Sequence, residues 1–227
     1  MGAGVNGRRR PLLVEVVGPA GVGKTTLTVD LEARGRAVRG TMWLLPKTLL
    51  AQNTIRQVPR ALAWYRDTGA LLWQEVKHLA RLDALHAFLH RSHWNGTRLV
   101  ILDEGPVYVL SWLQVQGHEY FRSRPDAWWR AALERWARSL DAVVVLDAPD
   151  SVLASRIRRR EKPHLMKDRS ATEVSAFLEA YRVASERVLQ CLAAAGGPPV
   201  LRLGVADGPK RLGDRFLAAL DQGVDAR

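Results

Sequence analysis

Leu12-Leu13-Val14-Glu15-Val16-Val17-Gly18-Pro19-Ala20-Gly21-Val22-Gly23-Lys24-Thr25 is an apolar run that leads directly into a glycine-rich segment. Residues 18–25 fit the phosphate-loop pattern G-x-x-x-x-G-K-S/T, which requires a strand before it and a helix after it. The glycines let backbone N–H groups turn toward phosphate oxygens. Lys24 adds a positive charge near the β- and γ-phosphates, and Thr25 offers a hydroxyl to Mg²⁺. The stretch therefore predicts a nucleoside triphosphate site on a strand–loop–helix unit.

A helix that begins near Gly23 would direct the positive end of its dipole toward the same phosphates. We expect Lys24 to act in catalysis and Thr25 to bind the metal. The residues expected to bind the nucleotide are Gly18, Pro19, Ala20, Gly21, Val22, Gly23, Lys24, Thr25 and Thr26.

Composition narrows the class of protein. The chain has 227 residues, 47% of them hydrophobic, and a formal net charge of +11. Arginine is spread along most of the expected helices without a zinc-finger or RNP-type motif, so we expect no nucleic-acid partner. No apolar run approaches the roughly 20 residues that span a bilayer, so no membrane partner is expected either. Cys191 is the only cysteine, which excludes an intrachain disulfide and fits a reducing cytoplasm.

The domain organisation expected from the sequence is simple. Arg8-Arg9-Arg10 followed by an apolar stretch is similar to the start of a signal peptide, but Glu15 interrupts that stretch. Residues 1–10 are therefore expected to form a flexible basic arm. Residues 11–227 are expected to form one domain, with a lid at about residues 156–170.

Apolar runs bounded by turn residues alternate with helical periodicity along the chain. This alternation predicts an α/β fold with three α/β/α layers and a five-stranded parallel sheet, because parallel strands need crossover connections and are buried on both faces. Strands are expected at residues 12–17, 37–43, 98–102, 142–146 and 200–203. Helices are expected at residues 24–34, 71–89, 126–140, 150–160, 172–195 and 209–220.

Two adjacent acids, Asp103 and Glu104, follow the buried strand at residues 98–102. Ligands gather at the carboxyl edge of such a sheet. An Asp there can hold Mg²⁺, and a neighbouring carboxylate can accept a proton from an attacking hydroxyl or water. Which of the two would be the base stays open. In the alternative interpretation, Asp103 caps a helix that begins near Pro106.

A basic cluster follows the fourth expected strand. Arg156 and Arg160 stand four residues apart and would share one face of a helix. Guanidinium groups fit phosphate oxygens, so this cluster predicts a lid over the transferring phosphoryl group. Arg158 or Arg159 would then face elsewhere. In the alternative interpretation the cluster is a solvated basic helix end.

These features together resemble the P-loop kinases of the thymidylate kinase and deoxynucleoside kinase group, and the resemblance covers most of the chain. The residues that carry it are the phosphate loop, the acids at 103–104, Leu146-Asp147-Ala148-Pro149 with Arg156 and Arg160, and the long helix around Phe177–Tyr181. The resemblance implies the P-loop NTPase fold, ATP and Mg²⁺. It also implies that Gln74 and Arg81, seven residues apart, bind the acceptor and that the loop at residues 204–208 borders the adenine.

The departures from this group fall on the acceptor side. At the end of the middle strand the kinases of this group have a sequence such as E-R-S or D-R, whereas this chain has Asp103-Glu104. Residues 40–46, which follow the second expected strand, lack the acidic residue that the group has there. We therefore expect an ATP- and Mg²⁺-dependent phosphotransferase acting on a nucleoside or nucleoside monophosphate, with an acceptor pocket drawn from residues 43–90 and 105–119. A kinase of another small molecule and a P-loop ATPase or switch remain alternatives. ATP versus GTP, and a homodimer, stay open.

Overall fold

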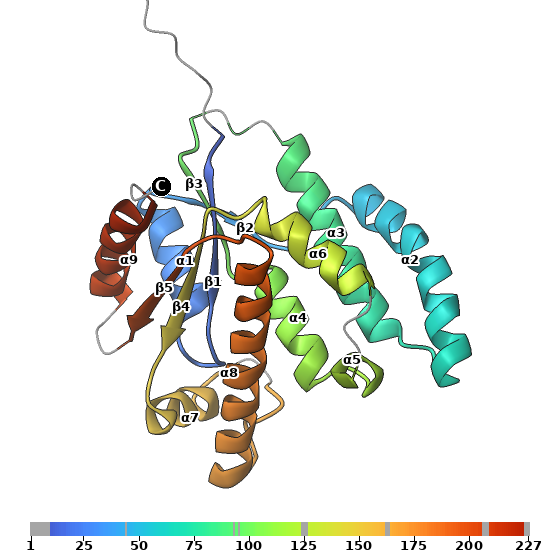
Figure 1. The fold of residues 1–227 in the computed structure, drawn as a ribbon. Coiled ribbons are helices and arrows are strands. Elements are labelled where there is room, and N and C mark those ends of the chain that lie inside the picture. Colours follow the sequence, from blue (N-terminus) through green and yellow to red (C-terminus); the bar gives the residue numbers. More distant parts are fainter. Residues whose placement is uncertain are drawn as a thin grey trace, which may run out of the picture.

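A parallel five-stranded sheet forms the centre of the protein in a computed structural model that describes residues 10–43, 45–92, 94, 96–123, 127–161, 164–205 and 209–224 (Figure 1). The strands are β1 (Leu12–Val17), β2 (Val38–Gly40), β3 (Leu99–Leu102), β4 (Ala142–Asp147) and β5 (Val200–Gly204). Their order is β2-β3-β1-β4-β5, and all neighbours are parallel. The predicted fold class is confirmed.

The central strand β1 fixes the position of the site. Its residue Glu15 lies in register with Leu102 of β3 on one side and Val143 of β4 on the other. Because parallel strands end at the same edge of a sheet, the segments that follow β1, β3 and β4 meet there. These segments are the phosphate loop, the acidic pair and the chain that leads into the basic cluster.

Helices cover both faces of the sheet (Figure 1). On one face, α1 (Lys24–Ala33) packs against α9 (Pro209–Val224). Apolar side chains from both helices, including Leu27, Leu31 and Phe216, are buried against Val14 and Val16 of β1. This half of the core anchors the helix that follows the phosphate loop.

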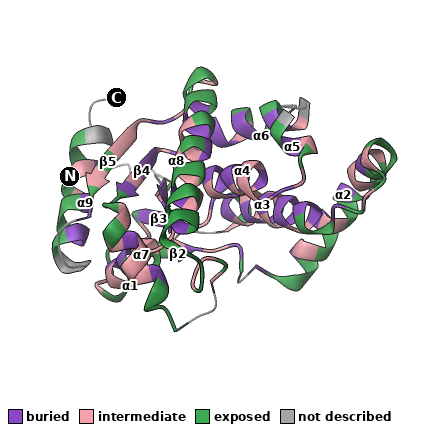
Figure 2. Cartoon of the chain, turned by 90° about the horizontal axis from the view of Figure 1, so that it is seen from below, coloured by how far each residue is buried: buried purple, intermediate pink, exposed green. Residues whose placement is uncertain are grey.

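The other face carries α3 (Trp73–Arg91), α4 (Pro106–Val115), α6 (Ala127–Ala137) and α8 (Ala171–Ala194). The buried faces of α3 and α4 turn inward, whereas much of α8 is exposed along its outer side (Figure 2). The remaining helices are α2 (Lys47–Thr68), α5 (Tyr120–Ser123) and α7 (Asp150–Arg158). None of the described helices has the length and hydropathy needed to cross a membrane.

Helix α2, which is not among the helices expected from the sequence, pairs with α3 and extends away from the sheet (Figure 1). Its buried face includes the polar residues Asn53 and Gln57, whereas Ile55 and Leu62 are exposed. Pro59 also lies inside the helix. An apolar pattern that faces solvent gives no amphipathic signal for a core-facing helix, which explains the omission.

Candidate active site

The phosphate loop forms a tight turn between β1 and α1. Gly18 has φ 145°, and a Cβ at this position would lie 2.2 Å from the backbone oxygen of Leu146 in β4. Gly23 has φ 105° and immediately precedes α1. Only glycine adopts these backbone angles readily, and only glycine fits beside Leu146. Gly18 therefore lets the loop pass close to β4, and Gly23 lets helix α1 begin directly after the loop.

Lys24 lies inside this loop. Its Nζ donates hydrogen bonds to the backbone oxygens of Gly18 at 2.6 Å and Pro19 at 3.3 Å. Burial lowers the pKa of Lys24 to about 8, and the nearby carboxylates of Glu104 and Asp103 oppose this shift. The ammonium group is thus held close to the loop amides, where an anion would bind.

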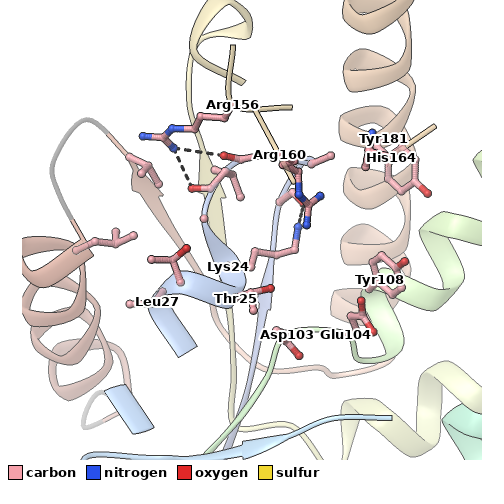
Figure 3. A pocket seen from close by; sticks show the side chains of 18 of the residues that line it. Lys24, Thr25, Leu27, Asp103, Glu104, Tyr108, Arg156, Arg160, His164 and Tyr181 are labelled. Atoms are coloured by element: carbon pink, nitrogen blue, oxygen red, sulfur yellow. Dashed lines mark hydrogen bonds between the residues drawn. The ribbon is translucent and has the colours of Figure 1, made fainter. Parts of the chain in front are cut away.

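A cavity of about 570 Å³ opens above the loop (Figure 3). The predicted site residues that line it are Gly18, Ala20, Gly21, Val22, Gly23, Lys24, Thr25, Thr26, Asp103, Glu104, Arg156 and Arg160. Pro19 does not line the cavity, although its carbonyl holds Lys24. Three segments far apart in the sequence therefore contribute to one cavity.

The loop has the features that a triphosphate requires. Among the described residues, no side chain caps the beginning of α1, so its first N–H groups remain available to an anion. A Cβ on Gly23 would meet no atom within 4 Å, which leaves space next to these groups. The cavity volume also falls within the range of small-molecule sites, about 300–1,000 Å³. These residues fit the phosphates of a nucleotide.

The oxygen donors near the loop suit Mg²⁺. The hydroxyl of Thr25 and the carboxylate of Asp103 both line the cavity, and Mg²⁺ prefers such oxygen ligands. In the described part of the chain, no group of three or more His, Cys, Asp or Glu side chains could hold a metal ion. Mg²⁺ is usually held by one or two protein oxygens together with phosphates and water, and Thr25 and Asp103 could supply such oxygens.

The two acids differ in their surroundings. Asp103 is buried, whereas Glu104 is half-buried and accepts a hydrogen bond from Nε1 of Trp43. Burial, with a contribution from the charge of Asp103, raises the pKa of Glu104 to about 7. In Figure 3, Glu104 lies below Tyr108, whose pKa is raised to about 12 by burial and by the charges of Glu104 and Asp103.

Glu15 is a buried acid that the sequence analysis did not assign to the site. Its carboxylate accepts hydrogen bonds from the backbone N–H groups of Gly105, Val107 and Tyr108. It therefore caps the beginning of α4, and the alternative in which Asp103 caps this helix is wrong. Burial raises the pKa of Glu15 to about 7, although the three backbone hydrogen bonds and Lys24 lower it. The signal in the sequence was a charged residue inside an apolar strand.

The basic cluster lies over the loop. Nη1 of Arg156 donates to the backbone oxygens of Gly21 at 3.4 Å and Val22 at 3.3 Å. Helix α7 ends at Arg158, so Arg160 lies beyond the helix and the expected shared helical face is wrong. Arg160 nevertheless lines the cavity and is close enough to lower the pKa of Lys24.

Arg158 and Arg159 are exposed and are not among the residues that line the cavity. An ion-pair network fixes the start of α7 nearby. Arg182 of α8 binds Asp147 at 3.1 Å and Asp150 at 2.7 Å. The helix that carries Arg156 is therefore tied to α8.

A wall of aromatic side chains lines one side of the cavity. It consists of Tyr108 from α4, His164, and Phe177 and Tyr181 from α8. Tyr108 lies next to Glu104, and His164 and Tyr181 lie together along α8 (Figure 3). The Phe177 and Tyr181 ring centroids are 4.9 Å apart. Tyr108 falls within residues 105–119, the segment expected to contribute to an acceptor pocket. The sequence analysis did not assign the other three residues to the pocket, because they come from distant segments.

The predicted acceptor residues Gln74 and Arg81 do not line the cavity. Gln74 is exposed. The Arg81 guanidinium stacks on Trp43, 4.3 Å from the ring centroid, and Trp43 in turn binds Glu104. Arg81 therefore reaches the site indirectly, through Trp43.

The opposite end of the cavity is apolar. Leu27, Val205 and Leu212 line it next to Thr26. Val205 belongs to the loop that the resemblance places beside an adenine ring, and residues 206–208 of that loop lie outside the described residues. The cavity thus extends from an apolar end near α9, across the phosphate loop, to the aromatic wall.

The chain was compared with known protein families and structures. A family model described as an AAA domain matches residues 14–176. No curated protein sequence matches the chain.

Two structures of deoxyadenosine kinase from M. mycoides, one with bound dCTP and one with the products dCMP and a flexible dCDP, are similar to this chain, with TM-scores of 0.51 and 0.54. Each is 12% identical and is aligned over 93% of this chain and 100% of its own. Shikimate kinase from Bacteroides thetaiotaomicron is 14% identical, with a TM-score of 0.50 over 92% of this chain and 98% of its own. At this level of identity the likeness shows a shared fold.

Proposed function

We propose that this chain, which belongs to the AAA-domain family, is an ATP-dependent kinase that phosphorylates a hydroxyl group of a small ring-bearing molecule, with a nucleoside as the first candidate. The observation that carries the proposal is the single cavity that joins the phosphate loop, the acidic pair and the arginines. Solved kinases for two different acceptors share the fold, which supports a kinase without naming its acceptor.

The donor would occupy the loop half of the cavity. The loop amides and Lys24 would hold the β- and γ-phosphates, and the apolar end at Val205 and Leu212 would receive the base. Thr25 and Asp103 would hold Mg²⁺, which neutralises charge on the phosphates when it is bound. Arg160 would stabilise the charge on the transferring group, since it lines the cavity and its charge acts on Lys24.

Glu104 is the better candidate for the base. Its carboxylate lies at the cavity beside Tyr108 and is less buried than that of Asp103, so a bound hydroxyl group could reach it more easily (Figure 3). The acceptor hydroxyl oxygen would form a bond to the γ-phosphorus, the bond from that phosphorus to the β,γ-bridging oxygen would break, and ADP would leave. The hydroxyl proton would pass to Glu104. Asp103, which is more buried, would remain with the metal.

The aromatic wall supports a ring-bearing acceptor. Tyr108, Phe177 and Tyr181 offer flat aromatic faces, and the Tyr108 phenol lies next to Glu104 (Figure 3). Among the described residues that line the cavity, the cations are Lys24, Arg156 and Arg160, and all three lie at the phosphate loop or above it. Arg39 and Arg81 do not line the cavity, although their charges lower the pKa of Glu104. The cations of the lining by themselves favour a nucleoside over a nucleoside monophosphate.

Hydrolysis of ATP is the second candidate function. Adjacent acids at a strand end can activate water as well as an alcohol, and the AAA-domain match favours this alternative. In that case Glu104 would accept a proton from water, and ADP would form without any acceptor.

An acceptor screen tests the proposal. Purified protein with Mg²⁺ and ATP is incubated with nucleosides, nucleoside monophosphates, shikimate and unrelated alcohols, and ADP formation is measured. We expect ADP formation to depend on a nucleoside. Arg160→Ala should abolish most of it, whereas Arg158→Ala, the matched control, should not, because Arg158 is exposed and does not line the cavity. ADP formation that no acceptor stimulates would reject the kinase and favour hydrolysis.

A further inference from the structure

We propose that Glu15 is a positioning residue that fixes the acid-bearing turn at residues 103–105 relative to the phosphate loop. The inference concerns the geometry of this turn, and its consequence for turnover rests on the proposed kinase function. Glu15 lies on β1, and the turn follows β3. The carboxylate of Glu15 would therefore fix the positions of the two acids relative to the phosphate loop.

The hydrogen bonds of Glu15 reach across the sheet to the turn. Oε1 accepts from the N–H of Gly105 at 3.1 Å and from that of Tyr108 at 3.0 Å, and Oε2 accepts from Val107 at 3.0 Å. Glu15 has no exposed surface. The bonds thus bind both oxygens of a buried group to the turn and to the helix that carries Tyr108.

Gly105 shows how closely the two segments approach each other. A Cβ at this position would lie 2.7 Å from the carboxyl carbon of Glu15 and 2.9 Å from each of its oxygens. No side chain fits there unless the carboxylate moves. The residue after Glu104 is therefore pressed against Glu15, and the position of Glu104 depends on that contact.

Burial of a carboxylate is an expensive way to stabilise a strand. An apolar residue at position 15 would match Leu13 and Val17, which are buried on the same face of β1, without a desolvation cost. A cap for α4 could also come from a Ser or Asp at its own N-cap position, where this chain has Gly105. The long-range arrangement therefore does something that a local cap would not. It ties the turn to the strand that leads, three residues later, into Gly18.

Glu15→Gln and Glu15→Leu are the test variants. Gln keeps one of the two carboxylate oxygens, and Leu removes both. Glu75→Gln is the matched control, because Glu75 is also buried and accepts a backbone hydrogen bond, from His118 at 2.9 Å, but does not line the cavity. Hydrogen–deuterium exchange of the peptide that covers residues 103–108 is measured for each protein, together with kcat and KM for ATP.

We expect faster exchange at residues 105–108 in both Glu15 variants, with the larger effect in Leu, and no change there in Glu75→Gln. For the acceptor reaction we expect kcat to fall on the order of 10- to 100-fold with KM for ATP nearly unchanged, because a small misplacement of the acids affects the reacting geometry and leaves nucleotide binding intact.

Unchanged exchange at residues 105–108 in the Glu15 variants would overturn the proposal. It would also be overturned if Glu75→Gln lowered kcat as much as Glu15→Gln, because a general loss of stability would then explain both. If the wild-type protein transfers no phosphoryl group to any acceptor, the proposed function fails. The exchange data still decide whether Glu15 positions the turn.

Discussion

Replacement of Glu15 by Gln should change how the stability of the protein depends on pH. Burial raises the pKa of Glu15 from 4.5 to about 7. Between these two values the folded chain holds a proton that the unfolded chain has released. The free energy of unfolding therefore falls as the pH rises through this window, because the folded state is the one that binds the extra proton.

The size of the effect follows from the two pKa values. Linkage for one group with these values gives a loss on the order of 2 to 3 kcal/mol between about pH 5 and about pH 8. The contribution is fully present below the unfolded pKa and is lost as the pH passes the folded pKa. In Glu15→Gln this group does not titrate, so the loss is absent from the variant.

The assay is urea unfolding of both proteins at several pH values across this range. The difference in unfolding free energy between wild type and Glu15→Gln cancels the titration of all other groups. We expect the wild type to lose on the order of 2 to 3 kcal/mol of unfolding free energy relative to the variant from low to high pH. A constant difference, or a wild type that gains stability as the pH rises, would refute the reasoning and would mean that the three backbone hydrogen bonds outweigh the cost of burial.

Three further substitutions give separate predictions. Gly18→Ala would place a Cβ 2.2 Å from the Leu146 carbonyl oxygen. We expect it to lower the free energy of unfolding by about 3 kcal/mol or more, measured by thermal denaturation. An unchanged denaturation midpoint would contradict the packing at this turn. Arg160→Ala should reduce kcat on the order of 100-fold with little change in thermal stability, since Arg160 lines the cavity and is exposed. A steady-state kcat equal to that of the wild type would remove Arg160 from the site. Trp43→Phe keeps a ring beneath Arg81 but removes the hydrogen-bond donor to Glu104, and we expect about a tenfold loss of kcat. The same loss of kcat in Arg81→Met, with Trp43 intact, would show that the stacking rather than the hydrogen bond matters.

The phosphate-loop half of the cavity could be predicted because its determinants are local. The glycines and Lys24 form one continuous segment whose conformation follows from residue type, and an apolar strand comes directly before it. Asp103 and Glu104 could be placed at the same edge for the same reason, since parallel strands end together.

The rest depends on contacts between distant segments. Glu15 was visible as an acid in an apolar strand, but its partners at residues 105–108 lie some 90 positions away and are backbone groups, which leave no mark in the sequence. The aromatic wall combines α4 with α8, and no local pattern brings Tyr108 and Tyr181 together. Helix α2 was hidden because polar Asn53 and Gln57 are buried together with Leu49 and Trp64, whereas apolar Ile55 and Leu62 face solvent.

The most direct test of the account is mass spectrometry of the acceptor after incubation with the protein, Mg²⁺ and ATP, with Lys24→Ala as the inactive control. The account predicts that a nucleoside gains one phosphoryl group in step with ADP formation, and that Lys24→Ala, although folded, forms no product. ADP formation by the wild type without any phosphorylated acceptor, or equal product from Lys24→Ala, would contradict it.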